Sequence, residues 1–246
     1  GLGAGWMLED YDWAGLRFDK PRQRIERLEE ALTIIKSMWT TKKTTFIGKH
    51  YQVHDVPLKI PLPAGTAPPP ILVGGGGAKL LAVAGRHADI VGINPKIPGG
   101  RITAKTALDA TPDKIREKIR WLRAAAEAGG RNPDDIELNT LVFVAAITDT
   151  PGPVRDMVAA NTGMPAELVA ACPQFLIGSG AELRDVLHQR RAESGISYFV
   201  IQGQNPAQVE DFATVLFGAG SGVPVATALE QQLRGFSAGV QHADPH

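Results

Sequence analysis

The positions of apolar residues predict helices that alternate with short strands along most of the chain. In the segment 21–39, apolar residues recur every three or four positions and charged residues occupy the other faces, which is typical of an amphipathic helix. Thr111 is expected to be the N-cap of a second strong helix, which ends at Gly129 and Gly130. The predicted helices occupy residues 21–39, 78–86, 112–128, about 152–171, 181–193 and 206–216.

Apolar runs between these helices predict the strands. The run 136–147 carries few charges, which is typical of a strand covered on both faces in a parallel sheet. Alternating strands and helices are found in a barrel or a doubly wound sheet, and the spacing here favours the TIM (β/α)8 barrel. The predicted strands are 71–73, 89–93, about 137–146 and 198–202, with a strand remnant at 1–5, and residues 46–53 are predicted to form a surface β-hairpin.

The number of predicted strands is too small for a closed barrel. Because such a barrel needs eight strands, the sequence predicts an α/β barrel that lacks roughly its first three to four strands. Residues 1–217 are interpreted as the C-terminal part of a single barrel domain, and 218–246, which show no apolar stripe, as a poorly packed C-terminal tail. An incomplete barrel exposes a long apolar edge, so an inactive fragment or a remnant that binds a partner stays an alternative.

The composition narrows the classes of partner. The 26 basic and 26 acidic residues balance, so the net charge favours neither nucleic acid nor an anionic membrane surface. No apolar segment approaches the roughly 20 residues of a membrane span. The single cysteine, Cys172, cannot form an internal disulfide and is expected to be a small buried residue. We therefore expect a cytoplasmic protein, and the histidines show no spacing that predicts a metal site.

The segment 68–77 carries the most informative chemistry. A short apolar run ends there in four glycines, Gly74–Gly77, and a helix is predicted to begin directly after them. Because glycines lack side chains, several backbone N–H groups can approach one anion, and a helix N-terminus also attracts negative charge. The pattern predicts a phosphate-binding turn, with a flexible turn that holds no ligand as the alternative.

Two other candidate sites have an ordinary structural interpretation beside the functional one. Gly178–Gly180 precedes a predicted helix and could bind a second anion, but Ser179 and Glu182 have the spacing of a capping box. Glu9 and Asp10 follow the first strand remnant, where a carboxylate could exchange a proton with a substrate. A surface pair of carboxylates at the start of a helix is the simpler interpretation.

Several short segments are informative because of the order in which they follow one another. They are Leu2–Trp6 with Glu9–Tyr11, Phe46–Tyr51, Pro69–Gly75, Ala84–Val91, Phe175–Ser179 and Gly195–Val200. Together they resemble the luciferase-like monooxygenase superfamily, and in particular its deazaflavin (coenzyme F420) dependent oxidoreductases. The resemblance covers about residues 1–216.

This resemblance implies a TIM barrel with a deazaflavin or flavin at the C-terminal ends of its strands. The implied function is hydride transfer between coenzyme F420 and a small organic substrate. Barrels of this family often pair as dimers, so the resemblance also implies a homodimer. An FMN-dependent monooxygenase of the same fold is the alternative, since both cofactors carry a phosphate. In such relatives the turn after the fifth strand and the loop after the sixth hold the cofactor, and these correspond here to Gly74, Gly75, Gly76, Gly77, Asn94 and Lys96.

The sequence assigns no catalytic residue. Some relatives that act on sugar phosphates have a Glu where this chain has Trp6, which disfavours a sugar-phosphate substrate. Trp6 is interpreted as lining a pocket for a larger or less polar substrate, or as a core residue. The other catalytic residues of such relatives lie in their first three strands, which are expected upstream of Gly1. An isomerase or aldolase is disfavoured because Lys59 and Lys79 are poorly placed for a Schiff base.

Overall fold

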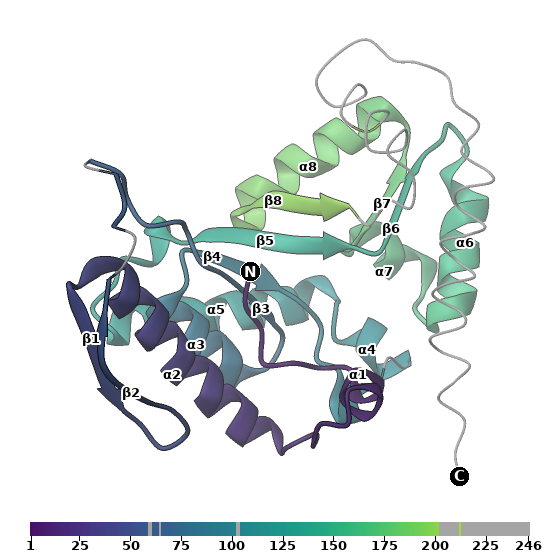
Figure 1. Ribbon diagram of the computed structural model, residues 1–246. Helices are drawn as coiled ribbons and strands as arrows, with labels where there is room; N and C mark the ends of the chain where they lie inside the picture. Colours follow the sequence, from purple (N-terminus) through teal and green to yellow (C-terminus); the bar gives the residue numbers. More distant parts are fainter. Residues whose placement is uncertain (59–60, 64, 102–103, 202–211, 213–246) are drawn as a thin grey trace.

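The computed structural model describes residues 1–58, 61–63, 65–101, 104–201 and 212. The helix predicted at 206–216, apart from Phe212, and the tail predicted at 218–246 lie outside the described residues. Within them, strands and helices alternate as the apolar pattern predicts (Figure 1).

A parallel sheet forms the centre of the described structure. Its strand order is β3-β4-β5-β8, and all three pairings are parallel. A second parallel pair, β6-β7, follows directly, because β6 continues the chain of β5 beyond Phe143. The bounds are β3 Leu72–Gly75, β4 Ile90–Ile93, β5 Glu137–Val142, β6 Val144–Ile147, β7 Phe175–Gly178 and β8 Ile196–Ile201.

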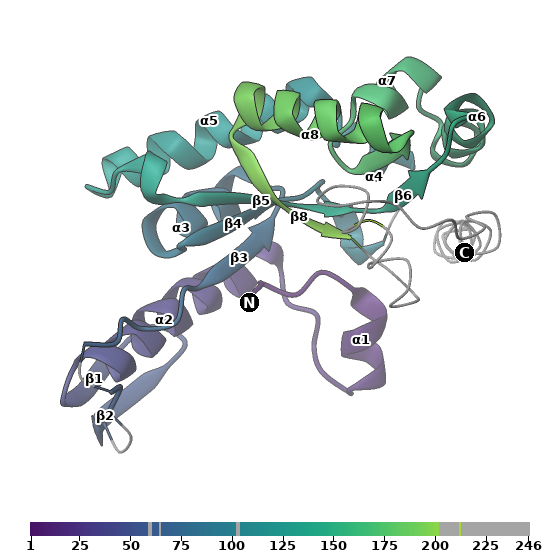
Figure 2. The same ribbon diagram turned by 90° about the horizontal axis from the view of Figure 1, so that it is seen from above.

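Helices follow the strands and cover one side of this sheet. Figure 2 shows α5 and α8 along the same side. The hairpin predicted near residues 46–53 is confirmed as the antiparallel pair β1 (Lys43–Ile47) and β2 (Gln52–Pro57). The helices are α1 Leu8–Trp13, α2 Pro21–Thr40, α3 Ala78–His87, α4 Ala104–Leu108, α5 Pro112–Ala128, α6 Pro151–Thr162, α7 Ala166–Ala171 and α8 Gly180–Ser194, with 3-10 turns at Pro98–Gly100 and Pro133–Asp135.

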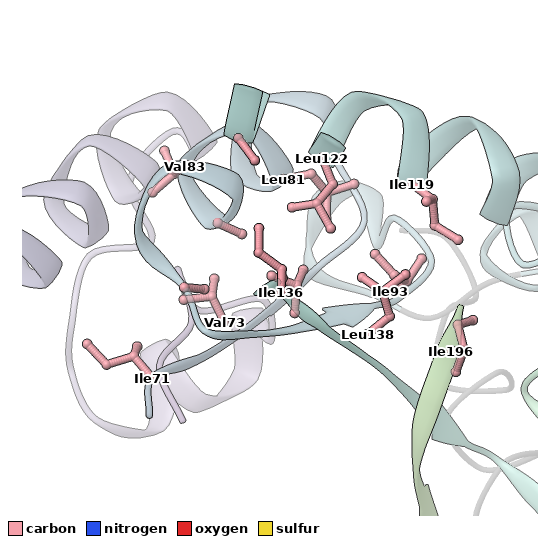
Figure 3. Packing of buried hydrophobic residues seen from close by; sticks show 14 of the residues in the cluster. Ile71, Val73, Leu81, Val83, Ile93, Ile119, Leu122, Ile136, Leu138 and Ile196 are labelled. Carbon is pink, nitrogen blue, oxygen red and sulfur yellow. The ribbon is translucent and has the colours of Figure 1, made fainter. Parts of the chain in front are cut away.

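The two faces of the sheet have different compositions. Val73, Val91 and Leu138 are register partners and are buried against α3 and α5, where Leu81 and Leu122 complete the packing (Figure 3). Because side chains alternate across a strand, their neighbours point to the other face. These neighbours are Gly74, Gly92 and Asn139, which are again register partners. The second face therefore combines bare backbone with a polar amide.

One predicted helix is divided in the structure and one strand is additional, each for an identifiable reason. The helix predicted at about 152–171 is two helices, because Gly163 ends α6 in the left-handed conformation at φ 69° and Pro165 begins α7 as its N-cap. Strand β7 was not predicted, since its four buried residues are too few to show a period. In the part of the chain that the structure describes, the sheet is open and Leu2 forms a parallel bridge to Val73 beside it.

Candidate functional site

The four glycines join the end of β3 to the start of α3. Gly74 and Gly75 belong to β3, and Gly77 is the N-cap of α3 with an extended backbone at φ −92° and ψ 145°. None of the four has a positive φ, so left-handed backbone is not the reason for glycine here. Close approach is the reason at Gly76, because a Cβ there would lie 2.3 Å from the carbonyl oxygen of Asn94.

The space beside Gly77 is open. A Cβ at Gly77 would meet no heavy atom of the described residues within 4 Å. Gly77 also has no side chain that could accept the N–H groups of the first turn of α3, and no side-chain cap is present. The first N–H groups of a helix have no intrahelical acceptor, so this helix start favours an external anion.

Asn94 follows β4 directly and lies beside the glycine turn. Its side-chain amide occupies space left by two glycines, since a Cβ at Gly74 or Gly92 would lie 3.1 or 3.4 Å from Asn94 Nδ2. The backbone N–H of Asn94 donates to the Gly75 carbonyl at 3.0 Å. Its buried Oδ1 atom has no hydrogen-bond partner among the described residues. A buried carbonyl oxygen without a donor costs about 1–3 kcal/mol, so a ligand that donates there would be stabilised.

We call Gly74–Gly77, the first turn of α3 and Asn94 the glycine cradle. The structure brings these predicted residues together at the carboxyl ends of two neighbouring parallel strands, β3 and β4. A cradle of backbone donors suits a phosphate, because a helix start adds favourable electrostatics to unpaired N–H groups.

Lys96 lies next to the cradle through its backbone but not through its ammonium group. The Lys96 nitrogen would lie 2.7 Å from a Cβ on Gly76, and its N–H donates to Asp109 Oδ2 at 2.7 Å. The ammonium instead lies over the indole ring of Trp121 on α5, 5.1 Å from the ring centroid. Binding of phosphate by Lys96 stays a prediction.

Lys118 is a buried cation next to the cradle that the sequence reasoning missed. Its side chain is 0% exposed, and its Nζ atom donates to the Asn94 carbonyl at 3.0 Å and to Asp109 Oδ2 at 2.6 Å. Burial lowers the pKa of Lys118, and the Asp109 carboxylate acts in the opposite direction. One signal was available: Lys118 stands three residues after Ile115, on the buried stripe of α5.

The second candidate anion site is closed by its own side chains. Ser179 Oγ accepts the N–H of Glu182 at 3.3 Å, and Glu182 Oε2 accepts the N–H of Ser179 at 2.8 Å. This reciprocal pair is the predicted capping box, which is confirmed. The start of α8 therefore already has acceptors for the donors that an anion would need.

The other residues considered from the sequence, Glu9, Asp10, Trp6 and Cys172, do not add to the glycine cradle. Glu9 and Asp10 lie in the first turn of α1, as expected for a surface pair, and no described geometry links them to the cradle. Trp6 is 41% exposed, so it is not a core residue. Cys172 is buried as predicted, and burial raises its pKa to about 11, which disfavours a thiolate.

The described residues contain neither a cluster of metal ligands nor a helix suited to a membrane. No three His, Cys, Asp or Glu residues within the described ranges are grouped so that they could hold a metal ion. No described helix is both long and apolar enough to cross a membrane.

Comparisons with known proteins place the chain in a family. The chain is 30% identical over 137 residues to an F420-dependent glucose-6-phosphate dehydrogenase of Kineococcus radiotolerans, which covers 56% of the chain and 36% of that protein. It is 29% identical over 189 residues to an F420-dependent hydroxymycolic acid dehydrogenase of Mycobacterium tuberculosis, covering 70% of the chain and 47% of that protein. The chain thus spans less than half the length of these two relatives.

The fold also matches a solved structure. An F420-dependent secondary alcohol dehydrogenase in complex with an F420-acetone adduct superposes with a TM-score of 0.60 and 17% identity, covering 81% of this chain and 62% of that one. At that identity the likeness shows the fold, which is that of part of a luciferase-like TIM barrel. The family model of the luciferase-like monooxygenases matches residues 1–195. The chain therefore belongs to the luciferase-like monooxygenase family.

Proposed function

We propose that this chain is part of an oxidoreductase that transfers a hydride between coenzyme F420 and an organic substrate. The observation that carries the proposal is the glycine cradle, in which the uncapped start of α3 opens beside Gly77. Two relatives whose names specify F420 support this cofactor. The phosphate of the cofactor would accept the free N–H groups of the helix start.

The residues present fit such a phosphate. A side chain at Gly76 would collide with the segment 94–96, and a side chain at Gly77 would fill the open space. The buried Asn94 Oδ1 atom is an acceptor, so it would pair with a donor on another part of the cofactor and not with the phosphate. When bound, the deazaflavin supplies the two-electron chemistry, and the cradle residues hold its phosphate and so orient the ring.

FMN-dependent monooxygenation is the second candidate function. The matching family is described as luciferase-like monooxygenase, and FMN also presents a phosphate. The cradle contacts a phosphate through backbone N–H groups, which do not distinguish between the two ring systems. A cofactor titration therefore has to include both.

We further propose that the substrate is large or weakly polar. Trp6 is 41% exposed, and Gly100 approaches its backbone, since a Cβ on Gly100 would lie 2.6 Å from the Trp6 carbonyl. An exposed aromatic ring can pack against the apolar surface of a substrate. Two relatives illustrate the alternatives of a weakly polar substrate and a sugar phosphate. The one from Mycobacterium tuberculosis is named for hydroxymycolic acid, and the one from Kineococcus radiotolerans is named for glucose-6-phosphate.

A fluorescence titration tests the proposed function. The chain, and a version that begins at its initiating Met, are titrated with F420, with FMN and with the phosphate-free deazaflavin riboside. We expect F420 to bind at least tenfold more tightly than the riboside, because only F420 carries the phosphate. Tighter binding of FMN than of F420 would favour the monooxygenase. Binding of neither cofactor by the longer version would contradict both functions, and binding by the longer version alone would favour the inactive fragment.

A further inference from the structure

Three buried polar side chains converge on the carboxyl end of β4. Thr140 Oγ1 and Gln174 Nε2 each lie 3.4 Å from the carbonyl oxygen of Ile93. Lys118 Nζ donates to the next carbonyl, that of Asn94, at 3.0 Å. All three side chains are 0% exposed, and they come from β5, from the segment before β7 and from α5. This strand end is therefore held from three separate elements.

The Lys118 ammonium group has three N–H donors, and three acceptors surround it. Besides the Asn94 carbonyl, it donates to the carbonyl of Asp109 at 2.7 Å and to Asp109 Oδ2 at 2.6 Å. The same Asp109 carboxylate oxygen accepts the N–H of Lys96 at 2.7 Å. The ammonium and the carboxylate together thus fix both ends of the segment 94–96.

A buried lysine is a costly way to fill this position. An apolar side chain of similar length would continue the buried stripe of Ile115, Ile119 and Leu122 without the cost of desolvating a charge. A buried ion pair adds little net stability, and in some proteins its role is to fix the geometry of the groups that it contacts. What Lys118 contributes is therefore the position of the groups around it.

The segment that Lys118 holds is the wall against which the glycine turn rests. A Cβ on Gly76 would lie 2.3 Å from Asn94 O, 2.5 Å from Pro95 C and 2.7 Å from the nitrogen of Lys96. With backbone packed this closely on backbone, a shift of the segment 94–96 displaces Gly76, and with it the start of α3.

We infer that Lys118 is a positioning residue for the glycine cradle, acting through the Asn94 carbonyl and Asp109. The inference rests on the proposed function, because it concerns the phosphate of the same cofactor. The Lys118 side chain is fully buried and donates only to Asn94 and Asp109, so its removal should act through the cradle and alter the phosphate part of binding more than the ring part.

Comparing the binding of F420 with that of its phosphate-free riboside separates a positioning role of Lys118 from a general loss of stability. Lys118→Met removes the charge but keeps the chain length, and Lys114→Met is the matched control because Lys114 is an exposed lysine one turn earlier on the same helix. We expect Lys118→Met to raise the Kd for F420 at least tenfold and to leave the Kd for the phosphate-free riboside within twofold. Equal weakening of both ligands, or no change in either, would overturn the inference.

The double variant Lys118→Met with Asp109→Asn is used in case Lys118→Met does not fold, because removing both partners leaves no buried charge uncompensated. It loses the same ammonium contacts to the carbonyls of Asn94 and Asp109, so we expect the same ligand selectivity. If the wild-type protein binds neither F420 nor FMN, the proposed function fails and the inference falls with it. If the wild-type protein binds F420 but the variants lose both ligands equally, the inference alone fails.

Amide hydrogen exchange gives a readout that needs no cofactor. The N–H groups of Asn94 and Lys96 donate to Gly75 O and Asp109 Oδ2 respectively. We expect both to exchange at least tenfold faster in Lys118→Met than in Lys114→Met, while the Ser179 N–H at the start of α8 keeps its rate. Unchanged exchange at Asn94 and Lys96 would overturn the positioning role even if F420 binds.

Discussion

The starts of α3 and α8 are two junctions of the same kind with opposite outcomes. Each helix follows a short parallel strand, β3 or β7, and each junction contains glycine. At α8, Ser179 is the N-cap and forms a complete capping box with Glu182. At α3, Gly77 is the N-cap and no side chain accepts the first N–H groups. One helix start is closed by its own residues, and the other is open.

This difference shows what a glycine pattern between a strand and a helix means. Glycine allows close approach, but an anion also needs N–H groups that no side chain already satisfies. Gly178 and Gly180 beside a serine and a glutamate therefore indicate a cap, whereas Gly77 followed by Ala78 leaves the donors free.

The largest effect is expected from Gly76→Ala. The added methyl would lie 2.3 Å from the Asn94 carbonyl oxygen and 2.5 Å from Pro95 C, both backbone atoms that yield only if the loop moves. We expect the free energy of unfolding to fall by about 1–3 kcal/mol. F420 binding should weaken at least a hundredfold because the cradle is displaced. Urea unfolding and fluorescence titration measure the two quantities.

The control for this variant is Gly152→Ala on α6. A Cβ there meets nothing within 4 Å, so the same methyl should leave F420 binding unchanged and raise stability by about 0.5–1 kcal/mol. If Gly76→Ala matches Gly152→Ala in both measurements, the close approach of segment 94–96 to the turn does not matter.

Gly77→Ser would convert the open junction into a closed one. The backbone at Gly77 is already extended and the space beside it is open, so a serine fits and its hydroxyl can accept an N–H of the first turn. We expect stability to rise by a few tenths of a kcal/mol. F420 should bind about tenfold more weakly, because a donor to its phosphate is taken.

Gly77→Ala distinguishes the hydroxyl from the added bulk. Alanine introduces the Cβ but no acceptor, so it should not raise stability as serine does. If the serine variant binds F420 as tightly as the wild type, the free donors of α3 do not hold the phosphate, and the comparison of the two helix starts loses its functional meaning.

Ser179→Ala tests the closed junction. Loss of the hydroxyl removes the acceptor for the Glu182 N–H, and we expect the free energy of unfolding to fall by about 1 kcal/mol. The Kd for F420 should stay within twofold, since this helix start lies outside the glycine cradle. Ser197→Ala, an exposed serine on β8, is the control and should change stability by less than about 0.5 kcal/mol. A tenfold loss of F420 affinity in Ser179→Ala would show that α8 also binds the cofactor.

Much of this comparison could be predicted from sequence because it depends on local spacing. Ser179 and Glu182 stand three residues apart, which is sufficient to predict the capping box. The strand and helix on either side of Gly74–Gly77 also follow from short-range apolar patterns. The spacing of nearby residues is therefore sufficient to predict both helix starts.

The parts that could not be predicted depend on contacts between distant residues. Lys118 has the sequence appearance of a surface lysine, and only its meeting with Asp109 and the Asn94 carbonyl makes its burial possible. The orientation of the Lys96 ammonium toward Trp121 likewise depends on where α5 packs. Such contacts are set by tertiary packing, which a single sequence does not display.

The smallest expected effect is a pH dependence that only the closed junction should show. The pKa of Glu182 lies below its ordinary value of 4.5, first because its carboxylate accepts the backbone N–H of Ser179. A carboxyl group with a lowered folded-state pKa stabilises the folded protein above pH 4.5, and this contribution is lost as the pH falls through the lowered value. We expect exchange of the Ser179 N–H, corrected for its intrinsic rate, to accelerate below pH 4.5.

Glu182→Gln is the matched control for this titration. Glutamine also completes a capping box but carries no titrating proton, so exchange at Ser179 should become independent of pH. The N–H groups at the start of α3 should show no such acceleration in either protein, because Gly77 has no titratable cap. If Ser179 in the wild type behaves as it does in Glu182→Gln, the carboxylate does not hold the helix start. The two junctions would then differ only by the serine hydroxyl.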